Sequence, residues 1–250
     1  TVDTTPPGVP VVTAPANNST VIGKRPVIKG TTEVGSSVAI KLDSSDVTAA
    51  VDGSGNWSYT PTADLAEGLH TFKVKARDAA GNEGAESSES SFTVALPEVE
   101  MLISSPGFPS VVEIKLNNFD KLYAIEVHLE YTNAYSNEDA VSNEAIFNNP
   151  ETSVSAYSEL MDSGIRTFTY VATQYSNGTT PVDNFPAFTE RKSLFTLNLT
   201  PDLIGPGTVS IKRVIVVDKD ANIVGDSEHP ETLKLVNPEY SFTVNEVPML

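Results

Sequence analysis

Oxygen-bearing side chains cluster in one short run, "DKDANIVGD" at 218–226, where Asp218, Asp220 and Asn222 alternate directly after an apolar stretch. Carboxylate and amide oxygens at this spacing are the ligands that calcium prefers. An EF-hand loop also needs glycine at its sixth position and glutamate at its twelfth, where this run has Ile223 and His229. Asp and Asn also favour tight turns. The run therefore predicts a hairpin turn, with a bound cation as the alternative.

A histidine lies between two carboxylates on one expected strand. Glu126, His128 and Glu130 alternate with apolar residues in "LYAIEVHLEY", so all three are expected on the solvent side of a sheet. A zinc site would need at least one more ligand from a neighbouring strand. The pattern fits a solvated strand face, whose side chains are available as contacts for a partner.

Catalytic chemistry finds little support in the residue types. The chain has three His, no Cys and no GxSxG motif, which argues against a nucleophilic triad. Its 33 acidic residues would allow many carboxylate pairs for glycoside hydrolysis, but nothing singles one pair out. We therefore expect a protein that is not an enzyme.

Aromatic rings suggest a different activity, because exposed rings can bind sugars. Trp57 alternates with Tyr59 in "NWSYT", which predicts a core position instead. The better candidates for glycan contact lie in loop-like segments rich in Gly, Pro and Asn: Tyr135, Tyr175, Phe185 and Phe188.

The composition bounds the class of protein. Val, Thr and Ser are abundant and 17 Pro and 15 Gly are scattered, which is typical of an all-β chain with many turns. The net charge of −17 repels phosphate backbones and anionic lipid surfaces, so nucleic-acid binding is not expected. No apolar run approaches the ~20 residues that a membrane span needs, so membrane insertion is not expected either. Such a charge suits a secreted or cell-surface protein. The opening "TVDTTPPGVP" is typical of a linker, which predicts a fragment of a longer chain.

Two near-copies of one strand divide the chain. "SSFTVALP" at 90–97 and "YSFTVNEVP" at 240–248 each alternate Phe and Val and then meet Pro, which is how a β-sandwich domain ends. We therefore expect one domain over 1–96 and a second over 97–250. Period-2 alternation recurs in both halves, whereas 132–165 is polar, with one weakly helical patch at 144–147.

The first half resembles the bacterial Ig-like repeats of surface adhesins and multimodular secreted enzymes. The resemblance rests on "VIGKRPVIKGTTEVGSSVAI" and "VDGSGNWSYTPTADLAEGLHTFKVKARDAAGNEG" and covers 1–95. It implies a spacer with an Ig-like sandwich fold, and it places Asp78 and Asn82 in the last hairpin. Asp3 could approach that hairpin from the linker, and calcium held there would stiffen a module junction. The alternative is a plain turn.

The second half resembles a cohesin module, the jelly-roll sandwich of cellulosome scaffolds, which is related in fold to some carbohydrate-binding modules. The resemblance rests on the order of three strand-rich segments: "VVEIKLNNFDKLYAIEVHLEY", then "GIRTFTYVATQYSNGTTP", then "SLFTLNLTPDLIGPGTVSIKRVIVVDKDANIV". It implies that one sheet face docks a protein partner of dockerin type, with Glu126, His128 and Glu130 as contacts. It also implies that the Asp-rich run at 218–226 is a hairpin.

The sequence thus predicts two β-sandwich domains in tandem, Ig-like and then cohesin-like, from an extracellular bacterial protein of the cell surface or of polysaccharide degradation. The preferred function is non-catalytic docking of a dockerin-type protein. Two alternatives stay open. One is a carbohydrate-binding module that targets an attached enzyme to polysaccharide, and the other is an adhesin stalk stiffened by calcium.

Overall fold

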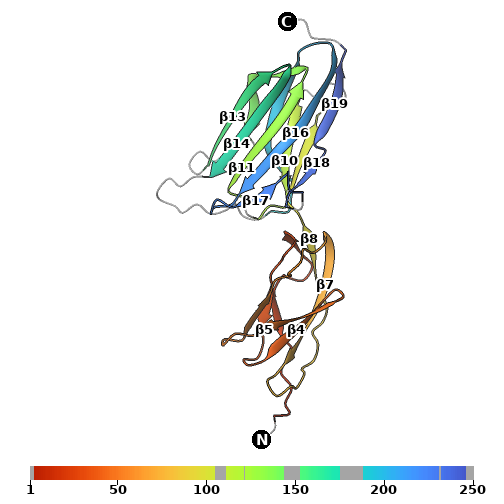
Figure 1. The fold of residues 1–250 in the computed structure, drawn as a ribbon, viewed down its shortest axis with the longest axis vertical. Helices are drawn as coiled ribbons and strands as arrows, with labels where there is room; N and C mark the ends of the chain where they lie inside the picture. Colours follow the sequence, from red (N-terminus) through yellow and green to blue (C-terminus); the bar gives the residue numbers. More distant parts are fainter. Residues whose placement is uncertain are drawn as a thin grey trace. The chain divides into compact units, whose positions relative to one another are not determined.

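The chain folds entirely as β-structure in the residues that the computed structural model describes, which are 3–104, 111–120, 122–143, 153–174, 188–230 and 232–245 (Figure 1). No helix occurs in these ranges, and accordingly none that is long and apolar enough to cross a membrane. The chain divides into two compact units, Thr1–Ala95 and Leu96–Leu250. The all-β fold class expected from the sequence is confirmed.

The first unit is a sandwich of a three-stranded and a five-stranded sheet, with strand orders β1-β3-β6 and β2-β8-β7-β4-β5. All neighbours are antiparallel except β2 and β8. The strands are β1 (Val11–Ala14), β2 (Ser19–Ile22), β3 (Ile28–Thr31), β4 (Ser37–Leu42), β5 (Ser45–Ala50), β6 (Asn56–Tyr59), β7 (Gly68–Arg77) and β8 (Ser90–Ala95).

Alternating apolar side chains build the core of the first unit. Trp57 on β6 is 2% exposed and packs within the buried cluster, which confirms the core position expected for it. Gly30 on β3 is required beneath it, because an added Cβ would lie 2.7 Å from Cζ2 of the indole and 1.9 Å from the carbonyl oxygen of Val11. Alternate apolar residues on β4 and β7 are likewise buried: Val38, Ile40, Leu42, Phe72, Val74 and Ala76.

The second unit is a sandwich of two larger sheets. One has the order β12-β15-β10-β9-β18, and the other has the order β13-β14-β11-β16-β17, with β19 also paired to β16. The strands are β9 (Glu98–Ile103), β10 (Val111–Asn117), β11 (Ala124–Thr132), β12 (Ala134–Asn143), β13 (Ser153–Asp162), β14 (Ile165–Gln174), β15 (Lys192–Pro201), β16 (Gly205–Val217), β17 (Ile223–Asp226), β18 (Lys234–Val236) and β19 (Glu239–Val244).

The core of this unit fills the space between the two sheets. Aromatic rings cross from one sheet to the other: Tyr170 on β14 stacks on Phe195 of β15 with ring centroids 4.3 Å apart, and Phe168 lies 5.7 Å from the same ring. All three side chains are at most 1% exposed. Aromatic pairs at these separations add stability beyond the burial of their area.

One strand departs from simple alternation. Unbroken alternation from Val209 and Ile211 would predict Ile215 on the inner side of the sheet, but Ile215 lies on the outer side, opposite Glu126. The pairing of β16 with β11 shifts between Arg213, opposite His128, and Ile211, opposite Leu129. The extra residue, Lys212, forms a β-bulge that reverses the side-chain alternation after it. Val214 and Val216 take the inner positions instead.

The polar stretch 132–165 supplies the edge strands of both sheets. β12 pairs with β15 at one edge, and β13 pairs with β14 at the edge of the other sheet. Glu159 of β13 links the two edge strands, because its carboxylate accepts a hydrogen bond from the hydroxyl of Ser136 on β12. The same carboxylate accepts a hydrogen bond of 2.7 Å from the buried hydroxyl of Tyr131 on β11. The weakly helical patch expected at 144–147 lies outside the described residues.

Candidate functional site

One face of the second unit presents chemically varied side chains on four adjacent strands, β13, β14, β11 and β16. Directly opposite residues of antiparallel neighbours point to the same side of a sheet. Because the apolar partners on β11 are buried, its alternate residues Glu126, His128 and Glu130 define the outer face. Their registered neighbours form three rows: Ala156–Val171–Glu126–Ile215, Ser158–Thr169–His128–Arg213 and Leu160–Thr167–Glu130. We call these residues the sheet face.

His128 lies at the centre of the sheet face and is held in place on two sides. Its Nε2 is 2.5 Å from Oε1 of Glu126 on the same strand, and its Nδ1 is 3.3 Å from the hydroxyl of Thr169 on β14. The side chains of His128 and Glu126 are 28% and 39% exposed, so both remain accessible. The expected grouping of Glu126 and His128 is therefore a hydrogen-bonded pair, with Glu130 one row further along.

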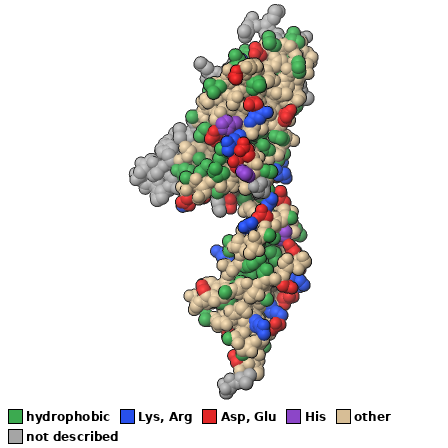
Figure 2. All heavy atoms as spheres, in the orientation of Figure 1, with side chains coloured by type: hydrophobic (Ala, Val, Ile, Leu, Met, Phe, Trp, Pro, Cys, Tyr) green, Lys and Arg blue, Asp and Glu red, His purple; other side chains and the backbone are tan. Residues whose placement is uncertain are grey.

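Basic side chains from β16, which no sequence pattern singled out, complete the charged centre of the sheet face. Nζ of Lys212 is 3.3 Å from Oε2 of Glu130, and a guanidinium nitrogen of Arg213 lies 3.4 Å from Asp226 and 3.5 Å from Glu228. The bulge turns Lys212 and Arg213 toward the same face. Figure 2 shows acidic, basic and histidine side chains gathered on this visible face of the second unit.

Asp226 anchors one border of this charged group. The backbone N–H of Glu228 hydrogen-bonds the Asp226 carboxylate and lowers its pKa. Burial opposes this effect, while the hydrogen bond and charge of Arg213 reinforce it. The backbone N–H of Asp226 donates a hydrogen bond of 3.1 Å to the hydroxyl oxygen of Thr232. Arg213 is therefore oriented by a fixed carboxylate.

Exposed apolar side chains border the charged centre. Val171 is 41% exposed beside Glu126, and Ile223 on β17 is 61% exposed. A flat surface with ion pairs at its centre and aliphatic side chains around it can bind another protein surface, because such interfaces combine apolar contact with complementary charge. The face is carried by long paired strands, so it is rigid before any partner binds.

Three five-residue turns share one structure. In each, an Asp carboxylate accepts bonds from the backbone N–H and side-chain amide of an Asn four residues later, with backbone N–H bonds of 2.8–2.9 Å: Asp52–Asn56, Asp78–Asn82 and Asp218–Asn222. The fourth residue has positive φ in all three, being Gly55, Gly81 and Ala221. The run at 218–226 therefore forms the hairpin turn between β16 and β17, as expected.

The residues of the expected junction site do lie together. The side-chain amide of Asn82 donates to the backbone carbonyl of Asp3 at 3.1 Å and to Oδ2 of Asp78 at 2.8 Å. The bond from Asn82 is the main cause that lowers the pKa of Asp78. In the second unit, Asp220 donates its N–H to Asp218 at 2.9 Å. No cluster of three or more potential metal-binding His, Cys, Asp or Glu side chains occurs among the described residues.

The structure describes two of the aromatic residues expected to bind sugar. Phe188 is 9% exposed and stacks on Phe119 at 5.8 Å, so it belongs to the core, which corrects the expectation for this residue. Tyr135 is half-buried, with the guanidinium carbon of Arg166 6.0 Å from the centre of its ring, and its contact with sugar stays a prediction. Tyr175 and Phe185 lie outside the described residues.

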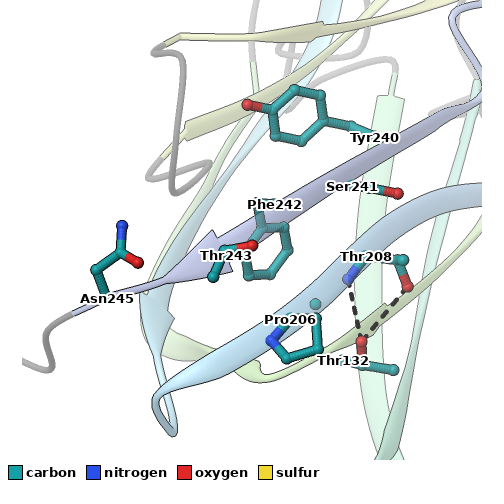
Figure 3. A pocket seen from close by; sticks show the side chains of 9 residues that line it. Thr132, Pro206, Thr208, Tyr240, Ser241, Phe242, Thr243 and Asn245 are labelled. Carbon is teal, nitrogen blue, oxygen red and sulfur yellow. Dashed lines mark hydrogen bonds between the residues drawn. The ribbon is translucent and has the colours of Figure 1, made fainter.

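A groove beside β19 has an uncharged lining (Figure 3). Its walls come from β11, β16 and β19, and the hydroxyl of Thr132 both accepts from the backbone N–H of Thr208 at 3.0 Å and contacts its hydroxyl at 3.4 Å. The lining residues are Thr132, Pro206, Gly207, Thr208, Tyr240, Ser241, Phe242, Thr243 and Asn245. No sequence pattern indicates this groove, because its residues come from three separate strands.

Comparison with known proteins finds similarity in both units. The family model described as bacterial Ig-like domain matches residues 13–95. No curated protein matches the chain significantly. The similar solved structures described next are cohesins or contain one.

Three of these structures show the range of the similarity. A non-cellulosomal cohesin from Archaeoglobus fulgidus is 17% identical over 61% of this chain and 93% of its own, with a TM-score of 0.39. A type I cohesin–dockerin complex from Clostridium thermocellum gives 17% identity over 60% and 99%, with a TM-score of 0.39. A cohesin module of a Clostridium perfringens family 33 glycoside hydrolase gives 18% over 60% and 90%, with a TM-score of 0.32.

Proposed function

We propose that this chain is a non-catalytic pair of modules, in which the second unit docks a protein partner of dockerin type and the first unit is a spacer. The observation that carries the proposal is the sheet face, with the His128–Glu126 pair at its centre and exposed aliphatic side chains at its borders. The resemblance of the sequence to cohesin modules supports the same function.

The geometry suits recognition of a protein more than of a small molecule. A sheet face is broad and flat, whereas small ligands bind in concave sites that enclose most of their surface. The strands hold His128, Glu130 and Arg213 in fixed positions through neighbouring hydrogen bonds and ion pairs. A preorganised surface loses little conformational entropy on binding, and its charges select the partner and its orientation.

The setting we propose is extracellular, in a bacterial multimodular protein of the cell surface or of polysaccharide degradation. The net charge of −17 and the Ig-like match over 13–95 support this setting. In such a protein the first unit would hold the second away from neighbouring modules, and the second would recruit a partner that carries a dockerin-type module.

The test is isothermal titration calorimetry of the full chain against a panel of purified dockerin modules with and without calcium. We expect at least one module to bind with a micromolar or tighter Kd, and Val171→Glu to weaken that binding. Failure of every module to bind would overturn the docking function. If the Val171→Glu variant bound the dockerin module as tightly as the wild type, the dockerin would have to contact a surface other than the sheet face.

The uncharged groove favours a second candidate function, binding of a neutral polysaccharide. In a chain with 49 charged residues, nine lining residues without a charge fit a ligand rich in hydroxyl groups. Affinity electrophoresis through gels that contain soluble neutral glycans tests this candidate. Retardation that Ser241→Ala with Thr243→Ala abolishes would support it, and unchanged mobility in every glycan would exclude it for those glycans.

A further inference from the structure

Five large aliphatic or thioether side chains are exposed together at one end of the second unit. Leu160 and Met161 on β13 are 72% and 64% exposed, Ile165 on β14 is 42% exposed, and Leu203 and Ile204 in the turn before β16 are 68% and 71% exposed. We call these five residues the apolar end. Burial of such side chains stabilises a protein, so their common exposure indicates a surface that another molecule covers.

The strand register places Leu160, Met161 and Ile165 at one end of the sheet, with Leu160 and Ile165 on its outer side and Met161 on the opposite side. Asp162, directly after Met161, pairs with Ile165 across the β13–β14 hairpin, and Ile165 pairs in turn with Thr132 of β11. Strands in a sheet are about 5 Å apart, so these positions lie within two strand spacings. Figure 1 shows the ends of β11 and β13 meeting at the upper end of this unit in the view, where hydrophobic side chains are visible in Figure 2.

Asn133 joins the remaining turn to this group. Its side-chain oxygen accepts the backbone N–H of Leu203 at 2.8 Å, and its amide donates to the carbonyl of Gly205 at 3.0 Å. An ion pair of 3.7 Å between Arg166 and Asp202 ties the same turn to β14. The turn that presents Leu203 and Ile204 is therefore fixed beside Ile165.

The acidic side chains around the apolar end indicate which kind of molecule could bind there. Glu159, Asp162 and Asp202 surround the group, whereas the neighbouring cation, Arg166, is already paired with Glu159 at 3.2 Å and with Asp202. A second copy of this chain would bring the same acidic rim against it, which is unfavourable. An anionic lipid surface would be repelled for the same reason. A basic rim on the occupant would complement the excess of carboxylates.

We propose that the apolar end is a second docking surface, which binds an amphipathic segment of another protein whose aliphatic side chains are flanked by lysine or arginine. The aliphatic side chains would cover Leu160, Leu203 and Ile204, and the cations would reach Asp162 and Asp202. Leu203 and Ile204 lie outside the sheet face, and Leu160 is the residue that the two surfaces share.

The test uses two synthetic amphipathic helical peptides with leucine on one face and either lysine or glutamate on the other. Binding to the full chain is measured by fluorescence anisotropy, for the wild type, for Leu203→Ser with Ile204→Ser, and for Leu69→Ser. Leu69 lies in the first unit and is 69% exposed, so its loss removes a comparable side chain outside the apolar end. The unfolding midpoint of each variant in urea confirms that it folds.

We expect the lysine peptide to bind the wild type and the Leu69→Ser variant equally, and to bind the double variant at least tenfold more weakly. The glutamate peptide should bind none of them. If the lysine peptide bound the double variant as tightly as the wild type, the proposal would be overturned, because the peptide would then be held by the net negative charge of the chain and not by Leu203 and Ile204. No binding to the wild type would overturn it too. A wild-type dimer in sedimentation velocity that the double variant abolishes would assign the surface to a second copy instead.

Discussion

His70 is hydrogen-bonded to Asp43 through its Nδ1, which lies 2.7 Å from Oδ2 of the carboxylate. The other ring nitrogen, Nε2, is 2.8 Å from the carbonyl oxygen of Ala66, and the ring stacks on Phe92 at 5.6 Å. A neutral imidazole carries one N–H, whereas both nitrogens here face an acceptor. The geometry therefore favours the imidazolium, which donates to both.

This arrangement predicts that the first unit loses stability as the pH rises. Burial alone lowers the pKa of His70, but the hydrogen bonds to Asp43 and Ala66 and the charge of Asp43 outweigh it and raise the pKa. The stabilisation is then fully present below about pH 6.5, the unfolded value, and is lost as the pH rises through the higher folded pKa. Thermal unfolding of the full chain between pH 5 and 9 should show a lower Tm for the first unit at the alkaline end.

Replacement of His70 separates this effect from general pH sensitivity. His70→Gln should flatten the dependence of the first unit's Tm on pH, and Asp43→Ala should cost about 1–3 kcal/mol, because it removes a bond to a charged group. His128→Gln, in the second unit, is the control and should leave the first unit unchanged. A wild-type Tm that stays constant across this range would contradict the prediction.

Alternation of side chains predicted much of the fold, because a strand with one buried face must place apolar residues two apart. It located β4, β7, β11 and β14 and the core position of Trp57. It could not locate β12 and β13, since polar edge strands such as "AYSNEDAVSN" carry little periodicity. Alternation also placed Ile215 on the wrong side of the sheet. The β-bulge at Lys212 arises from the pairing of β16 with β11, which the sequence of a single strand does not reveal.

The candidate site was predictable only in part, because side chains from different strands meet only in the folded sheet. The sequence placed Glu126, His128 and Glu130 on one face, since they share a strand. It could not show that Lys212 and Arg213 join them, nor that Asn133 fixes the turn at Leu203. Phe188 was misjudged because it lies in a loop-like segment rich in Gly, Pro and Asn, whereas its neighbour in space is Phe119.

Loss of Glu159 should destabilise the second unit. Its carboxylate accepts from the hydroxyl of Tyr131, a fully buried side chain, and from Arg166 at 3.2 Å. Burial is the main cause that raises the pKa of Tyr131; the hydrogen bond with Ser136 opposes it, and the bond to Glu159 and the charge of Glu159 add to the rise. Glu159→Ala leaves this hydroxyl without its acceptor, at an expected cost of about 1–3 kcal/mol.

Urea denaturation of the second unit measures this cost, with Glu239→Ala on the exposed edge of β19 as the matched control. A double-mutant cycle with Tyr131→Phe should show coupling, because Glu159→Ala costs less once the hydroxyl is gone. Additive effects of the two substitutions would show that the hydroxyl and the carboxylate do not interact.

The Asp–Asn turns should stabilise the fold without calcium. In the turn at 78–82 the carboxylate already accepts bonds from the backbone and side chain of Asn82, so a cation would have to displace them. We expect Asp78→Ala to lower the Tm of the first unit equally with millimolar calcium and with a chelator. The wild type should also lose this contribution as the pH falls from 4, because the folded pKa of Asp78 is lowered. A wild-type Tm that rises with calcium, and a variant whose Tm does not, would instead make Asp78 a ligand and favour the calcium-stiffened stalk.

The sheet face should lose its partner when either its apolar border or its centre is changed. Val171→Glu places a carboxylate directly opposite Glu126, and His128→Ala removes the group that pairs with Glu126 at 2.5 Å. Residues at the centre of an interface often contribute about 2 kcal/mol or more, so His128→Ala should weaken the binding of a dockerin module by about 30-fold. Val171→Glu should weaken it through the repulsion between two opposed carboxylates and the loss of apolar contact.

Lys115→Ala provides the matched control for this measurement. Lys115 lies on β10 of the opposite sheet, where it pairs with Glu113 at 3.3 Å, so its loss changes charge without touching the sheet face. Titration calorimetry should give the wild-type Kd for this variant. If Lys115→Ala weakened binding while Val171→Glu did not, the partner would lie on the opposite sheet, and the function would have to be assigned to that surface. Because the two faces are formed by different strands, these three variants decide between them.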